Sequence, residues 1–124
     1  MKVEQAVTLA QGIAAIMRAG NPLPTTFGFV LAVNAEKLKP ACAAFDAARQ
    51  KLIEEHGSRD EGGNLAVQDG NITLVNPKAY NAAMTELADQ DAGVEVINIS
   101  VDKLPAEMEP ATVAMLLPML TPTD

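Results

Sequence analysis

The sequence predicts a single α+β domain in which an antiparallel pair of helices packs on a small three-stranded sheet. Apolar residues recur at steps of three, four and seven over residues 22–57, the spacing of one long amphipathic helix. An Asp-Gly pair at residues 69–70 separates two short β-favouring runs, which is the strongest local signal for a hairpin. A further β-favouring run, VEVINI, covers residues 94–99. Because a two-stranded hairpin alone is marginal in water, we expect this run to add a third strand.

The length of 124 residues corresponds to one domain. A domain of this size buries about two thirds of the surface that its unfolded chain exposes. Within residues 1–124 the patterns divide the domain into three parts. A helical part covers about 3–57, a hairpin-helix-strand part covers about 64–101, and a short apolar helix covers about 110–118.

Two helices open the chain. Apolar spacing predicts the first helix over residues 3–18, with Gly20 as a left-handed stop and Pro22 preventing its continuation. Thr25 or Thr26 is expected to cap the second helix, which runs to Gly57. Proline removes a backbone donor inside a helix, so Pro40 must either kink this helix or divide it in two. The apolar stripe keeps its phase across Pro40, which favours one kinked helix.

A third helix and a third strand follow the predicted hairpin. Asn76 as N-cap with Pro77 at the first helical position predicts a helix that runs to about Asp89. Its apolar face is expected to bury Tyr80, Ala83, Met84 and Leu87. Alternation slips in the run at residues 94–99, which indicates either a strand buried on both faces or a bulge.

The most concentrated apolar patch lies in the C-terminal helix, which Pro110 opens and Pro118 closes. Two interpretations remain open for this patch: it closes the core of its own chain, or it is the surface that binds a partner or a second copy. Closing the core is the commoner role of such a helix, whereas the argument for a partner surface is that methionine-rich helices adapt well to grooves. The candidate interface residues are Val113, Met115, Leu116, Leu117, Met119 and Leu120.

Composition and charge exclude several classes of function. The formal net charge of −7 argues against nucleic acid and against anionic membrane surfaces, both of which require clustered Lys and Arg. No run approaches 18 consecutive apolar residues, so we expect no transmembrane helix. Alanine is abundant and aromatic residues make up 3% of the chain. Small side chains bury little area each, so burial of further surface in an oligomer is expected to help stability.

We find no motif for catalysis, for a metal or for a cofactor, and we predict a protein that is not an enzyme. Cys42 is the single cysteine and lies on a helical stripe, where an unreactive thiol is expected. His56 is the single histidine, and we expect it to interact with the carbonyls at a helix end. Asp60 and Glu61 lack the alternating ligand spacing of a calcium loop. The glycines at 57, 62 and 63 follow a helix, whereas phosphate-binding loops precede one.

The order of these signals resembles a family of small, functionally uncharacterised proteins of tailed bacteriophages. The resemblance covers residues 23–57, DEGGN at 60–64, 75–96 and most of 99–120. The matched positions are Leu23, Pro24, Asn34, Phe45, Ala48, Arg49, Leu52, Ile53, Gly57, Asp60 and Glu61. They are packing and turn positions, so the resemblance implies a phage origin and brings no catalytic residues.

Two functions follow from these expectations. The first is a non-enzymatic phage protein that acts by protein–protein contact, as a homo-oligomer, a virion-associated subunit or an assembly subunit. The alternative is an accessory protein that inhibits or sequesters a component of a host defence system. Either function implies a protein partner, the host bacterial cytoplasm as compartment with the virion as an open alternative, and no cofactor.

Overall fold

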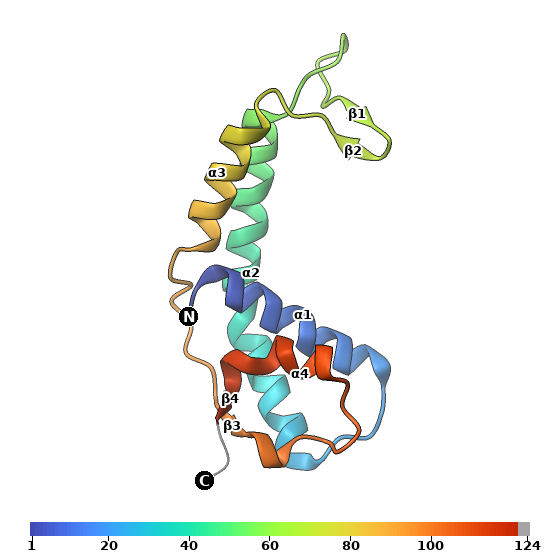
Figure 1. Cartoon of the computed structure of the whole chain (residues 1–124), viewed down its shortest axis with the longest axis vertical. Coiled ribbons are helices and arrows are strands. Elements are labelled where there is room, and N and C mark those ends of the chain that lie inside the picture. The colour runs from blue at the N-terminus through green and yellow to red at the C-terminus, as the bar shows by residue number, and fades with distance from the viewer. Residues whose placement is uncertain (122–124) are drawn as a thin grey trace.

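The structure is a computed structural model that describes residues 1–121, and it divides into a body and an arm (Figure 1). The body holds α1, the first half of α2 and α4, while the arm is formed by the second half of α2 and by α3. The helices are α1 (Val3–Ala19), α2 (Thr25–His56), α3 (Pro77–Ala88) and α4 (Pro110–Leu116). The 3₁₀ turns are η1 (Val101–Lys103) and η2 (Leu117–Met119). The strands are β1 (Val67–Gln68), β2 (Asn71–Ile72), β3 (Ile99–Ser100) and β4 (Leu120–Thr121). The prediction of a mixed helix-and-sheet fold is confirmed.

The first two helices form as their sequence signals predict. Gly20 follows α1 in the left-handed conformation, with φ of 70°, and the chain folds back so that α2 packs against α1. The predicted threonine cap is wrong, because Thr25 already lies inside α2 and Pro24 takes the capping position without a side-chain hydrogen bond. The helix α2 continues through Pro40 to His56, so Pro40 does not divide it.

The core of the molecule lies in the body. The first half of α2 contributes Phe27, Val30, Leu31 and Leu38, which recur at helical spacing on one face. They pack with residues of α1, β3, α4 and η2: Ala6, Leu9, Ile13, Ile99, Leu116 and Met119. Ile53, near the far end of α2, is also buried but lies outside this cluster.

The predicted three-stranded sheet is wrong. The described residues hold two separate pairs: β1 with β2 antiparallel at the far end of the arm, and β3 with β4 parallel in the body (Figure 1). Of the predicted strand at 94–99, Ile99 alone lies in a strand, β3. At Ile97 the side chain of Asn34 takes the place that a neighbouring strand would occupy. The Asn34 amide donates to Ile97 O at 2.9 Å and accepts from Ile97 N at 2.8 Å, so α2 satisfies the backbone of this segment.

The hairpin and the start of α3 confirm their local signals. Asp69 and Gly70 take φ values of 54° and 80°, as a two-residue turn between antiparallel strands requires. Asn76 caps α3, since its Oδ1 accepts from Ala79 N at 3.1 Å, and Pro77 takes the first helical position. The helix then returns beside α2 toward the body (Figure 1).

The loop between α2 and β1 is closed by its own hydrogen bonds. Asp60 Oδ1 accepts from Gly62 N at 2.9 Å and from Asn64 N at 3.0 Å, while the backbones of Arg59 and Leu65 form a bridge. This carboxylate oxygen therefore accepts from two backbone N–H groups of the loop, and Asp60 stabilises the turn in this way.

Candidate functional site

The six candidate interface residues of the C-terminal helix do not form one surface. Leu116 and Met119 are fully buried in the core, whereas Leu117 is 62% exposed. Val113, Met115 and Leu120 are half-buried. The helices α1 and α4 can pack this closely because Gly12 of α1 has no side chain. A Cβ at Gly12 would lie 2.9 Å from Met115 Cβ. The packed side of α4 therefore closes the core, and Leu117 is the exposed member of the six candidate residues.

The arm has no comparable core of its own. It consists of residues 41–56 of α2 together with α3, which lies wholly within the described part of the chain and has no buried residue. Ile53 near its outer end is buried, but the other apolar side chains between its two helices are half-buried, and we name these half-buried residues the arm seam. The arm seam comprises Ala41, Cys42, Phe45, Ala48 and Leu52 of α2 with Ala79, Tyr80, Ala83, Met84, Leu87 and Ala88 of α3. These residues recur at steps of three and four on both helices, so each helix turns one apolar stripe toward the other.

A few specific contacts hold the outer end of the arm. The rings of His56 and Tyr80 meet edge to face, with centroids 6.2 Å apart and an interplanar angle of 72°. Val75 N donates to His56 O at 2.7 Å, which ties the segment leading into α3 to the end of α2. Gly57 lies too close to the last turn of α2 to carry a side chain, because a Cβ at this position would lie 2.6 Å from Ile53 O. The single histidine is thus part of a packing contact between the two arm helices.

The sequence predicts that the apolar stripes of α2 and α3 are buried inside the molecule, so it does not predict the half-buried arm seam. The predicted burial of Tyr80, Ala83, Met84 and Leu87 is right in direction, since this is the half-buried side of α3. It is wrong in extent, because the arm extends past the body and only two helices share the apolar face (Figure 1). The spacing of apolar residues predicts the stripe on α3. How much of that stripe other elements cover depends on distant contacts, which no local pattern reports.

The whole chain exposes more surface than its mass requires. Its accessible surface is 8004 Å² for a mass of 13.0 kDa. A compact monomer of this mass exposes about 6300 Å², so the chain carries an excess of about 1700 Å². The narrow arm is the structural reason, because two helices side by side leave most of their circumference in water (Figure 1).

Large apolar side chains also remain exposed outside the arm seam. In the body Phe29 is 63% exposed and Leu117 62%, and beyond the arm helices Val67 and Val75 are 64% and 72% exposed. Among the described residues, buried side-chain polar atoms all have hydrogen-bond partners. These exposed apolar side chains are therefore the features of residues 1–121 that a contact with another molecule could cover.

The thiol of Cys42 lies at the base of the arm and is half-buried. Burial raises its pKa above the ordinary value, and the nearby Asp46 carboxylate adds to the shift. Both effects disfavour the thiolate, which is the reactive form of cysteine. The environment therefore works against a nucleophilic role for this residue.

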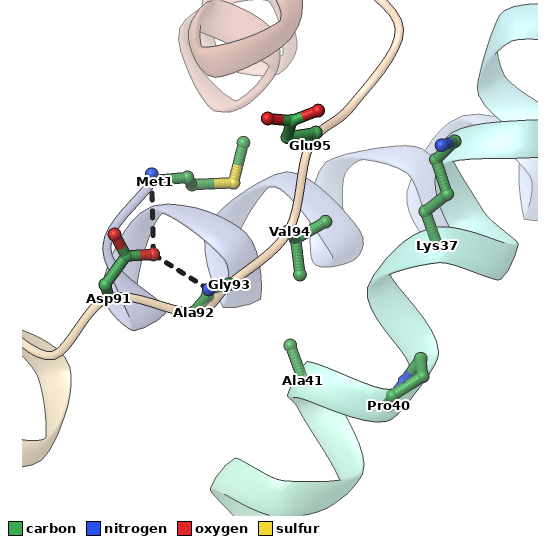
Figure 2. Close-up of a pocket in the computed structure, with 9 residues that line it drawn as sticks. All are labelled: Met1, Lys37, Pro40, Ala41, Asp91, Ala92, Gly93, Val94 and Glu95. Carbon is green, nitrogen blue, oxygen red and sulfur yellow. Dashed lines mark hydrogen bonds and ion pairs between the residues drawn. The ribbon is translucent and has the colours of Figure 1, made fainter.

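Two surface hollows lie along the body, and neither presents a set of convergent catalytic groups. The first, of about 700 Å³, lies between α2, with Lys37, Pro40 and Ala41, and the segment from Asp91 to Glu95 (Figure 2). The Asp91 carboxylate there accepts from Gly93 N at 2.8 Å and lies 4.0 Å from the Met1 amine. The second, of about 710 Å³, lies where the α1–α2 turn meets the residues before α4. Its acidic members are Glu107 and Glu109.

The described residues form neither a metal-ligating cluster nor a membrane-spanning helix. Within residues 1–121 no three His, Cys, Asp or Glu side chains gather as a metal site. No described helix is both long and apolar enough to cross a membrane.

Comparison of the chain with protein-family models, with curated proteins and with solved structures gave no match.

Proposed function

We propose that the protein acts without catalysis, by protein–protein contact, as a subunit that associates with copies of itself. The observation that carries this proposal is the excess of about 1700 Å² in exposed surface over a compact protein of the same mass. Removing apolar surface from water is worth about 25 cal/mol for each Å². An association that covers the arm supplies stability that the single chain lacks.

The proposal includes a role in the assembly or the particle of a tailed bacteriophage, inside a bacterial host. The resemblance of residues 23–57, 60–64, 75–96 and most of 99–120 to small phage proteins supports this part of the proposal. An assembly subunit needs a surface that identical copies share, and an arm free of the body supplies one. A bend of α2 at Pro40, where one backbone donor is missing, belongs to the same proposal because it sets the direction of the arm.

Light scattering of the purified full chain tests self-association directly. We expect the solution mass to exceed that of one chain and to fall toward it on dilution. A mass of one chain at every concentration tested would refute self-association. The alternative, sequestration of a host component through the acidic surface, would then take its place.

A further inference from the structure

We infer that a second copy of this chain docks along the arm seam, so that two arms together form one four-helix bundle. The inference rests on the proposed function, because it names the surface and the partner of that association. Two antiparallel helices with apolar faces are half of such a bundle, whose core takes residues from all four helices. In Figure 1 the helices of the outer arm are α2 and α3, with the β1–β2 hairpin at their far end, and no other helix of the described chain lies beside this part of the arm.

The low burial of α3 in the single chain favours such a partner. This helix has 12 residues and no buried side chain, although every residue of it is described. Isolated helices of this length are marginal in water, and most helical stability in proteins comes from packing an amphipathic face. The α2 side of the arm seam completes only part of that packing, since Phe45 and Leu52 are themselves half-buried. A second pair of helices over the seam provides the missing burial.

The surface excess of the whole chain is large enough for a stable dimer contact. A standard protein interface buries about 800 Å² on each partner. The surface excess of this chain is about twice that area, by comparison with a compact protein of 13.0 kDa. One arm-to-arm contact therefore accounts for about half of the excess, and the exposed apolar side chains of the body remain outside it.

The exposed charges of the arm are of both signs and nearly cancel. On residues 41–56 of α2 they are Asp46, Arg49, Lys51, Glu54 and Glu55, and on α3 they are Lys78 and Glu86. Three positive and four negative charges give the arm a net charge of −1, in a chain whose net charge is −7. Two copies of the arm can therefore meet with little net repulsion, which favours a second copy as the occupant.

A charge placed in the arm seam tests the docking surface. Met84→Glu is expected to reduce the solution mass to that of one chain, because the carboxylate cannot be buried in the bundle. Leu117→Glu is the matched control, since it places the same charge on an exposed apolar residue of the body. We expect Leu117→Glu to keep the wild-type mass, with circular dichroism reporting the helical content of both variants.

Cross-linking provides a second readout that does not depend on a disruptive variant. In a Cys42→Ser background, Ala48→Cys places a thiol at the middle of the arm, and Ala114→Cys places one on the exposed side of α4. A short bismaleimide is expected to join two chains through Ala48→Cys and not through Ala114→Cys.

The outcomes separate this inference from the proposed function. An oligomeric wild type, with no cross-link at Ala48→Cys and an unchanged mass for Met84→Glu, overturns arm docking while self-association stands. A monomeric wild type overturns both. If Met84→Glu loses its helical content, the cross-link at Ala48→Cys alone decides between docking and its absence.

Discussion

Asn34 joins α2 to the extended segment before β3 and is fully buried. Its amide exchanges two hydrogen bonds with Ile97, as a neighbouring strand would, and its Nδ2 lies 3.6 Å from Met119 Sδ. Asn34→Ala removes both partners of the Ile97 backbone and leaves a space in the core. We expect the free energy of unfolding to fall by about 2–4 kcal/mol, measured by urea denaturation. A loss below about 0.5 kcal/mol would contradict this role, since that is the range of ordinary surface changes.

Asn34→Asp tests the same contact through pH. The introduced carboxylate keeps one acceptor for Ile97 N but turns its other oxygen toward Ile97 O, and it lies where water is excluded. Both features disfavour the charged form and raise the pKa of the introduced group in the folded state. At low pH the group is neutral and can donate to Ile97 O. We expect the stability deficit relative to wild type to be smallest there, to grow as pH rises above about 4, and to level off above the raised pKa. A deficit independent of pH would contradict the geometry.

Cys42 offers a residue-scale test of the arm base. Burial and the Asp46 carboxylate both raise its pKa, so the thiolate is scarce at neutral pH. We expect Ellman's reagent to label Cys42 more slowly in the native protein than in urea. The native rate should keep rising with pH beyond about 8.5, the ordinary value for a cysteine. Equal rates in the native and unfolded protein would show a freely accessible thiolate.

At the scale of elements, the approach of α1 to α4 depends on Gly12. A Cβ at this position would lie 2.9 Å from Met115 Cβ, which is near the backbone and cannot turn away. We therefore expect Gly12→Ala to lower the free energy of unfolding by about 1–3 kcal/mol, as overpacking does. Gly28→Ala is the matched control, because its Cβ meets only Leu23 Cβ at an ordinary 3.8 Å. We expect that control to raise stability by about 0.5–1 kcal/mol through helix propensity. The packing argument fails if both substitutions stabilise the protein.

The elements divide into those that local signals determine and those that distant contacts determine. The stop at Gly20, the turn at Asp69 and Gly70 and the cap at Asn76 are each set by a few neighbouring residues, and the structure confirms them. The third strand was predicted from β propensity at residues 94–99. Its pairing was decided instead by Asn34, 63 residues away from Ile97, through a side-chain amide.

The candidate site shows the same limit. The apolar patch of α4 was visible in the sequence, but its division into buried Leu116 and exposed Leu117 depends on which face meets α1. The spacing also predicted the stripes of α2 and α3. It did not predict that they extend beyond the body, because periodicity reports that a face is apolar and not what covers it.

At the scale of the whole molecule, the body and the arm differ in how they are stabilised. The body buries side chains from α1, α2, β3, α4 and η2 in one cluster, whereas Ile53, which is 8% exposed, is the buried apolar residue of the arm within the described chain. Local opening costs least where few apolar contacts are buried. The arm of a single chain is therefore expected to open more readily than the body, unless a second copy covers it.

Hydrogen exchange at two protein concentrations tests this difference between body and arm. At a concentration where light scattering shows an oligomer, we expect the amides of α3 to be protected. On dilution to the single chain their exchange should accelerate, because α3 has no buried side chain to hold it. Amides of α1, which faces the core with Leu9 and Ile13, should exchange at the same rate at both concentrations. Met84→Glu, measured at the high concentration, should reproduce the fast exchange of α3. Unchanged protection of α3 on dissociation would mean that two helices suffice for the arm, and its seam would no longer indicate a second copy.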